Sequence, residues 1–152
     1  MFKYTLVPEA FFKPSEAHKI LSEAVRLSQT DKIEYQELPQ FKAVLVYALS
    51  PDEEAAPVIF DLLAEVLSIP EHNKVAACFD GEALHLAIVT GENLLLANSY
   101  PAGDPVTADY FLFAALKQFQ INPQVTTVYL REPVSPEMAD DIVRYCKGVE
   151  TL

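Results

Sequence analysis

The sequence predicts an α/β protein with a mixed sheet, in which a small β-α-β-β lobe precedes a three-stranded meander, a helix, a strand and a last helix. The main observation is the stretch 74–98, where three apolar runs are separated by the reversals Asp80-Gly81 and Gly91-Glu92. Asp-Gly between apolar runs is a strong hairpin signal. Elsewhere, segments of period two alternate with segments of helical period. We expect two parts, 1–49 and 50–152, that can pack as one compact unit.

The small lobe is predicted from three strand-like segments and one amphipathic segment. Residues 2–7 and 32–38 alternate as strands do, and 41–49 is apolar enough for a buried strand. Between the first two strands, Pro14 opens a helix whose apolar residues recur at helical spacing. A turn at Pro39-Gln40 joins the last two strands.

The second part begins with a capping pattern. Residues 50–53, Ser-Pro-Asp-Glu, match a capping box, and helical spacing of apolar residues continues from Val58 until Pro70. Because proline inside a helix removes a backbone hydrogen bond, we expect the regular turns to begin at Ala56 or Pro57.

The meander strands are predicted at 74–79, 82–89 and 93–98, and a turn-rich stretch at 100–105 follows them. We expect the Asp80-Gly81 reversal to be of type I′, which needs positive φ at both central residues.

The next helix is predicted to begin at the cap Thr107 and to run to about Gln120. Its residues 110–116 are apolar almost all round, so we expect this central helix to be covered on more than one side. The aromatic residues around it are expected in the core, and they are Tyr100, Tyr110, Phe111, Phe113 and Phe119. If their natural cover is absent, some of them form an apolar association surface.

A β-branched strand at 125–130 and an amphipathic helix from the N-cap Ser135 to Gly148 complete the chain. Cys146 lies on the inner face of this helix and Cys78 in a meander strand. We expect two buried free thiols, because a disulfide would require the fold to bring them together by coincidence. Free thiols fit a reducing compartment.

The composition excludes two classes of partner. Eleven basic and 22 acidic residues give a net charge of −11, which repels a phosphate backbone, so we expect no nucleic acid partner. No apolar run approaches the ~20 residues of a membrane span, and the first residues lack the features of a signal peptide. The expected location is the cytoplasm.

Several local strings carry a family resemblance. They lie at residues 4–12, 44–47, 94–100 and 108–112. They resemble number 3822 among the domains of unknown function, a bacterial family whose members are similar to actin-like ATPases. The resemblance implies that residues 50–152 form an actin-like, ribonuclease-H-like second lobe and that 1–49 is an inserted subdomain. It also implies that the chain corresponds to the later part of a longer protein, either truncated or naturally short.

The resemblance also implies where a nucleotide would bind. Actin-like ATPases hold phosphates between hairpins rich in Asp, Gly and Ser or Thr. Here Asp80 and Gly81 are the candidate cofactor-binding residues, as the remnant of such a phosphate loop, but a second glycine and a hydroxyl are lacking and Glu82 would repel phosphate. An ordinary tight hairpin is the favoured interpretation. Residues 130–134, where the family pattern implies open glycine backbone, read Leu-Arg-Glu-Pro-Val and indicate a pseudo-enzyme.

No catalytic residue and no metal site is predicted. His18, His72 and His85 lack a second ligand at metal-binding spacing. Ser99 and Ser135 lie outside the Gly-x-Ser-x-Gly pattern and have no base nearby in sequence, and Ser135 is explained as an N-cap.

Two functions remain open. The favoured one is a non-catalytic protein-interaction or scaffold module without a cofactor, which self-associates or docks to a protein partner through the surface flanking the central helix. The alternative is the ATP-binding half of an actin-like ATPase, with ATP and magnesium, completed by another chain or by a missing N-terminal lobe.

Overall fold

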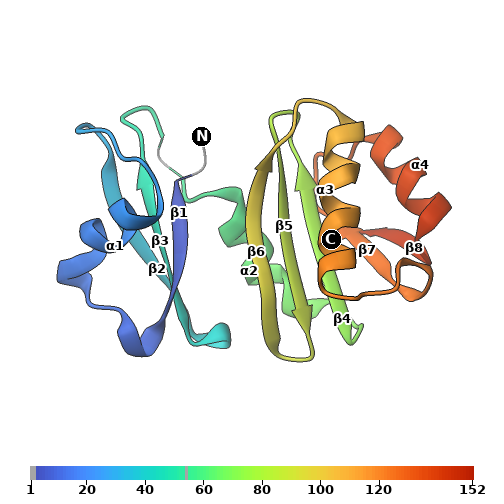
Figure 1. The fold of residues 1–152 in the computed structure, drawn as a ribbon, viewed down its shortest axis with the longest axis horizontal. Coiled ribbons are helices and arrows are strands. Elements are labelled where there is room, and N and C mark those ends of the chain that lie inside the picture. Colours follow the sequence, from blue (N-terminus) through green and yellow to red (C-terminus); the bar gives the residue numbers. More distant parts are fainter. Residues whose placement is uncertain (1–2, 54) are drawn as a thin grey trace. The chain divides into compact units, whose positions relative to one another are not determined.

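A computed structural model describes residues 3–53 and 55–152, and the chain forms two compact units, Met1–Phe60 and Asp61–Leu152 (Figure 1). Helix α2 (Val58–Glu65) spans the division between them. The sequence places the boundary earlier, after residue 49, and that assignment of domains remains a prediction.

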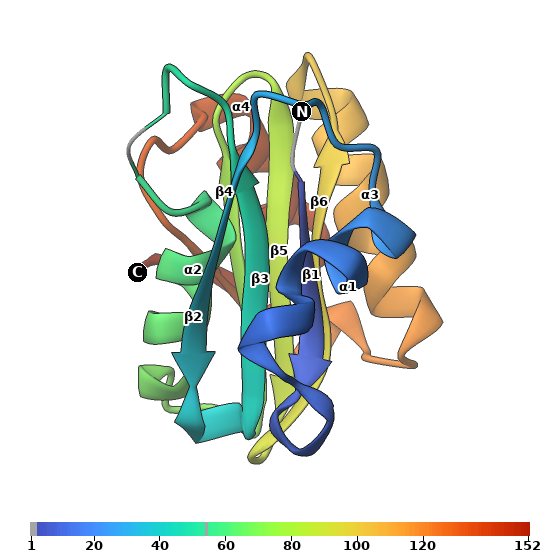
Figure 2. The same cartoon turned by 90° about the vertical axis from the view of Figure 1, so that its left-hand side faces the viewer.

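The first unit is the expected β-α-β-β lobe. Its strands form an antiparallel sheet of order β1-β3-β2, with bounds β1 (Tyr4–Pro8), β2 (Lys32–Leu38) and β3 (Ala43–Leu49). Helix α1 (Ala17–Ala24) packs on one face of this sheet (Figure 2). Leu21 belongs to the same apolar cluster as Val44 and Val46 of β3. A short 3₁₀ turn (Pro14–Glu16) precedes α1, so proline does open the helical segment.

The capping pattern at Ser50 closes a turn and not a helix. Glu53 N donates to Ser50 O at 3.0 Å, and the Ser50 hydroxyl donates to the Glu53 carboxylate at 2.6 Å. The regular helix begins only at Val58, after Pro57, so the predicted start was too early. Pro57 disfavours helical dihedral angles in the residue before it, which keeps Ala56 out of the helix.

The second unit contains a five-stranded mixed sheet of order β6-β5-β4-β7-β8. The meander is antiparallel, and β7 and β8 run parallel to β4. Its elements are β4 (Asn73–Phe79), β5 (Ala83–Thr90), β6 (Asn93–Pro101), α3 (Pro105–Gln118), β7 (Thr127–Leu130), α4 (Pro136–Tyr145) and β8 (Gly148–Thr151).

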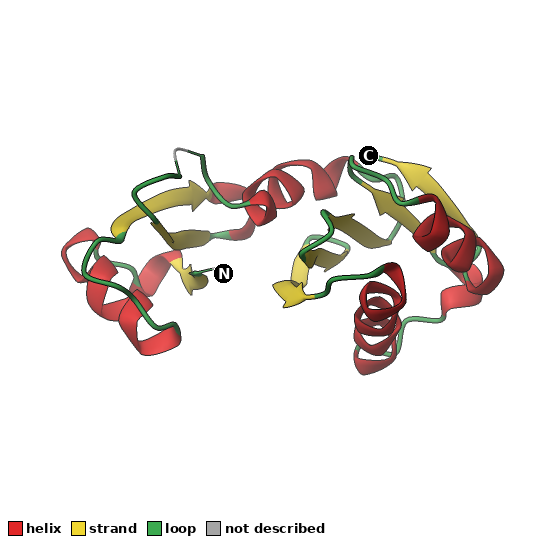
Figure 3. Cartoon of the chain, turned by 90° about the horizontal axis from the view of Figure 1, so that it is seen from above, coloured by secondary structure: helices red, strands yellow, loops and turns green. Residues whose placement is uncertain are grey.

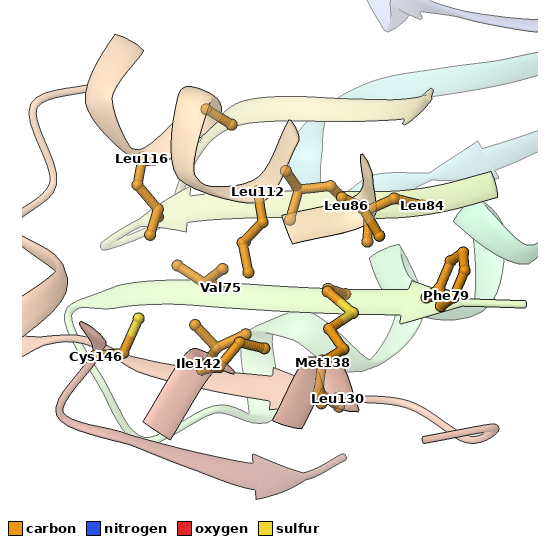
Figure 4. Packing of buried hydrophobic residues seen from close by; sticks show 14 of the residues in the cluster. Val75, Phe79, Leu84, Leu86, Leu112, Leu116, Leu130, Met138, Ile142 and Cys146 are labelled. Carbon is orange, nitrogen blue, oxygen red and sulfur yellow. The ribbon is translucent and has the colours of Figure 1, made fainter. Parts of the chain in front are cut away.

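Helices α3 and α4 lie on the same face of this sheet (Figure 3). Alternate residues of β4 and β5 point to that face, and they pack with the inner residues of both helices in one apolar core (Figure 4). Leu112, Leu116 and Ile142 supply the helical side of this core, and each has no exposed surface. The predicted order of meander, helix, strand and helix is confirmed.

Several elements differ from the prediction. The N-cap of α3 is Asp104, whose carboxylate accepts from Thr107 N at 2.8 Å, so the predicted cap Thr107 lies inside the helix. Strand β6 continues to Pro101, through the start of the stretch predicted as a turn. Strand β8 was not predicted, because a four-residue edge strand beginning with Gly148 carries almost no hydrophobic pattern.

Helix α3 is covered by the sheet and by α4, and its remaining face is open. Val106 and Tyr110 are 75% and 68% exposed, and Ala114 continues the same row one turn later. The two cysteines, Cys78 and Cys146, are buried and free, as predicted.

Candidate functional site

The hairpin between β4 and β5 contains Asp80 and Gly81. Gly81 has a φ of +89°, whereas Asp80 is not among the described residues with positive φ, so the predicted type I′ geometry is wrong. A Cβ on Gly81 would meet no atom within 4 Å. Glycine is therefore favoured here because it adopts a positive φ at no steric cost, and not because a side chain would lack space.

The Asp80 carboxylate is engaged within its own hairpin. Its Oδ1 accepts from the backbone N–H of Glu82 and of Ala83, both at 2.9 Å, and its Oδ2 lies 3.0 Å from His85 Nε2. Burial opposes ionisation, but the hydrogen bonds from His85 and the two amides outweigh it and lower the pKa of Asp80. Asp80 is thus an ionised carboxylate that organises the turn.

His85 joins this hairpin to strand β6. Its ring is 1% exposed, and Nδ1 lies 2.7 Å from the hydroxyl of Ser99, the residue directly opposite in the β5–β6 ladder. Because an ionised carboxylate only accepts, Nε2 carries a proton and donates to Asp80. In the neutral ring Nδ1 then accepts from the Ser99 hydroxyl.

Asp80, His85 and Ser99 therefore form a hydrogen-bonded chain, which we call the polar triad. The order of carboxylate, imidazole and hydroxyl is that of serine hydrolases. Sequence spacing had suggested no base near Ser99, and the strand register brings one there. The sequence could not predict the pairing of His85 with Ser99, because that pairing depends on which residues of the two strands face each other.

Burial decides what the polar triad can do. A general base must reach the proton that it removes from a reacting group. His85 is almost without exposed surface, whereas Asp80 is exposed and Ser99 is half-buried. The triad is best described as a hydrogen-bonded network with a buried imidazole at its centre, which fixes the hairpin to β6.

A second constellation lies where the carboxyl ends of the parallel strands β4 and β7 meet, the usual ligand-binding edge of such sheets. Arg131 follows β7, and its guanidinium lies 3.4 Å from the Asp61 carboxylate and 3.7 Å from that of Glu65, both on α2. Its backbone N–H donates to Ala77 O at 2.9 Å. Side chains thus occupy the edge where the family pattern implies open glycine backbone.

Cys78 lies at the same edge, and its thiol donates to Glu132 O at 3.6 Å. Burial raises the pKa of this thiol despite the nearby Arg131 charge. It is therefore protonated at neutral pH and a poor nucleophile.

The remaining residues singled out from the sequence do not join these clusters. Ser135 is the N-cap of α4 and accepts from Met138 N at 3.3 Å, as predicted. His18 and His72 are exposed. Across residues 3–53 and 55–152, no three His, Cys, Asp or Glu side chains group as a metal site.

One unusual residue was missed from the sequence. Asp109 on α3 is only 8% exposed, and neither carboxylate oxygen has a hydrogen-bond partner among the described residues. Burial raises its pKa to about 7, and the carboxylate of Asp141 on α4 adds to the rise. The sequence signal was an acid within an apolar helix, but its neighbour on α4 becomes evident only in the fold.

A hollow of about 650 Å³ lies over the end of α1 and the following loop. It is open to solvent and contains none of these clusters. Two other hollows adjoin each other at the C-terminal ends of α3 and α4.

Comparison with known proteins places this fold. A family model described as "Protein of unknown function (DUF3822)" matches residues 2–67 and 53–145. No curated protein matches the sequence.

Two solved structures share the architecture. One, from Bacteroides thetaiotaomicron VPI-5482, is a protein with an actin-like ATPase fold and unknown function; it aligns with a TM-score of 0.79 and 17% identity, over 99% of this chain and 65% of that one. The other is a PilM-PilN type IV pilus biogenesis complex, with a TM-score of 0.56 and 13% identity over 100% of this chain and 66% of that one. The fold is therefore that of actin-like ATPases, and this chain spans slightly less than two thirds of each protein's length.

Proposed function

This chain belongs to the DUF3822 family of proteins of unknown function, and from that membership we propose that it is a non-catalytic protein-interaction or scaffold module on an actin-like ATPase fold. The observation that carries the proposal is the Asp80 carboxylate, which accepts two backbone amides and contacts His85 within its own hairpin. A phosphate loop must instead direct backbone amides and a metal-binding carboxylate toward the ligand. Asp80 and Gly81 are, in this proposal, a phosphate-loop remnant that now only holds a turn.

The loop after β7 supports the same proposal. Arg131 is paired with Asp61 and Glu65, and Pro133 follows it, so the edge carries side chains where a nucleotide would need open backbone. Two acids at this edge also disfavour the approach of phosphate.

A protein partner is suggested by one structural neighbour, which was solved as the PilM-PilN complex. We propose that this chain likewise acts by binding a protein, either another copy of itself or a different partner. Its two buried thiols support a reducing, cytoplasmic location. Among the described residues, no helix has the length and apolar character needed to cross a membrane.

The alternative is an ATP-binding half that another chain or a further lobe completes. It is favoured by the open surroundings of Gly81 and by the coverage of only 65% and 66% of the two similar chains. Under this alternative, Asp80 would exchange its hairpin contacts for magnesium and ATP.

Calorimetric titration with ATP and magnesium separates the two functions. We expect no dissociation constant tighter than about 100 μM, which corresponds to roughly 5 kcal/mol of binding. The Asp80→Asn variant is the control, since it keeps an oxygen for the two amides while removing the negative charge. Tighter binding that this variant abolishes would establish the alternative.

A further inference from the structure

The two hollows at the C-terminal ends of α3 and α4 share Phe113, Asn122 and Pro123, and so lie next to each other in the second unit. Their volumes are about 430 and 440 Å³. We call this pair of hollows the aromatic groove, lined by Phe113, Lys117, Ile121, Asn122, Pro123 and Tyr145. It is distinct from the polar triad and from the Arg131 edge.

The walls of the aromatic groove are fixed by backbone hydrogen bonds. The end of α3 is closed by Ile121 N donating to Leu116 O at 2.9 Å, and the Asn122 side chain accepts from Gln124 N at 3.0 Å. Lys147 N, just after α4, donates to Pro123 O at 3.0 Å. A groove built this way is preformed, so binding need not order it first.

The groove presents an aromatic pair to an incoming side chain. The rings of Phe113 and Tyr145 meet edge to face with centroids 5.7 Å apart, and Tyr145 is 60% exposed. Aromatic rings beside a proline provide a large apolar contact with little side-chain entropy to lose.

The charged side chain that lines the groove is basic. It belongs to Lys117, and Lys147 lies beside the lining residue Pro123 through its backbone N–H, although the net charge of the chain is −11. The acidic residues next along the chain are Asp141 and Glu150. Lys117 and Lys147 are exposed, while Arg144 lies 3.9 Å from Asp141. A partner that meets this basic rim gains electrostatic complementarity.

We propose that the aromatic groove binds an acidic segment of a partner protein, which inserts one aromatic or large aliphatic side chain beside Phe113 and Tyr145 and places carboxylates near Lys117 and Lys147. The proposal rests on the proposed interaction function and names its surface and the chemistry of the partner. An acidic amphipathic segment fits both the apolar walls and the rim. Nucleic acid is disfavoured because the rest of the surface is strongly acidic.

The test uses the full chain labelled with ¹⁵N and four hexapeptides of sequence Glu-Glu-X-Gly-Glu-Glu, with X as Phe, Trp, Leu or Ser. We expect saturable amide shifts confined to residues 113–124 and 145–147 with the first three peptides. The serine peptide should bind at least tenfold more weakly, because it lacks the anchor. A peptide with lysine in place of each glutamate should produce no shifts.

Charge reversal distinguishes specific from general attraction. The double variant Lys117→Glu and Lys147→Glu should weaken peptide binding at least tenfold, and the matched double variant Lys13→Glu and Lys19→Glu, on the first unit, should leave it within twofold. Absence of groove shifts at millimolar peptide, or equal weakening by both double variants, would overturn the groove proposal. Neither result affects the ATP titration. The groove proposal can therefore fail in the peptide experiment while the proposed non-catalytic function still passes the titration, and the reverse also holds.

Discussion

Asp109 links the burial of a single carboxyl group to the stability of the second unit. In an unfolded chain its pKa is near 3.8, and in the fold it is about 7. Between these values the folded state holds a proton that the unfolded state has released, so the free energy of unfolding falls as pH rises through this window and levels off above it. Below pH 4 both states are protonated and the group imposes no penalty.

We therefore predict that Asp109→Asn stabilises the protein above pH 7, by about 1–3 kcal/mol, and has little effect near pH 4. The amide keeps the shape of the carboxyl group and carries no charge toward Asp141. Urea unfolding of both proteins at pH 4, 5, 6, 7 and 8 measures the difference. Parallel pH profiles for the two proteins would contradict the shifted titration.

Asp80 provides a second prediction for a single side chain. Asp80→Ala removes the acceptor of two backbone amides and the partner of His85, so we expect a loss of about 2–4 kcal/mol in the free energy of unfolding. Asp80→Asn keeps one oxygen for the amides and should lose less. Chemical denaturation of the three proteins gives the order, and a harmless Asp80→Ala would mean that water replaces these contacts at no cost.

At the scale of elements, the hairpin between β4 and β5 depends on one dihedral angle. Gly81→Val should cost about 1–3 kcal/mol, because a β-branched residue resists a φ of +89°. Gly103→Val is the matched control, since Gly103 has no neighbour within 4 Å of an added Cβ and no positive φ. Thermal unfolding compares them, and equal melting temperatures would show that the turn relaxes around valine.

Most elements could be predicted because their hydrophobic periods are strong. Strand β2 was predicted with the bounds that the structure has, and the apolar meander and α4 with its cap Ser135 were placed within a few residues. Strand β8 could not be predicted, since its pairing with β7 comes from the sheet and not from its own residues. The polar triad was missed because it depends on the register between β5 and β6, and the Asp109–Asp141 neighbours because α3 and α4 are far apart in sequence.

At the scale of the whole molecule, the open face of α3 favours self-association. Val106, Tyr110 and Ala114 form an exposed row on this helix. A two-fold contact would bury the same row on both copies. The charge of −11 opposes nonspecific clustering more than it opposes one specific contact.

We predict that the chain forms a dimer of twice its 16.9 kDa mass at several milligrams per millilitre, and that Tyr110→Glu shifts it to the monomer. Sedimentation velocity measures both. Lys19→Glu, on α1, serves as the control for an added acidic side chain. If the unmodified chain sediments only as a monomer, the prediction is wrong, and α4 and the sheet cover enough of α3 for the monomer to be stable without a dimer contact.

The two free cysteines allow thiol labelling to measure local opening of the second unit. Cys146 lies in the core beneath α3 and α4, while Cys78 points to the opposite face of the sheet, since Ala77 and Phe79 beside it belong to that core. Burial raises the pKa of both thiols, that of Cys146 to about 11, so a labelling reagent must wait for each face to open. In variants that keep a single cysteine, the labelling rate would thus report how often each face of the sheet opens. The first unit has no cysteine and would give no labelling signal.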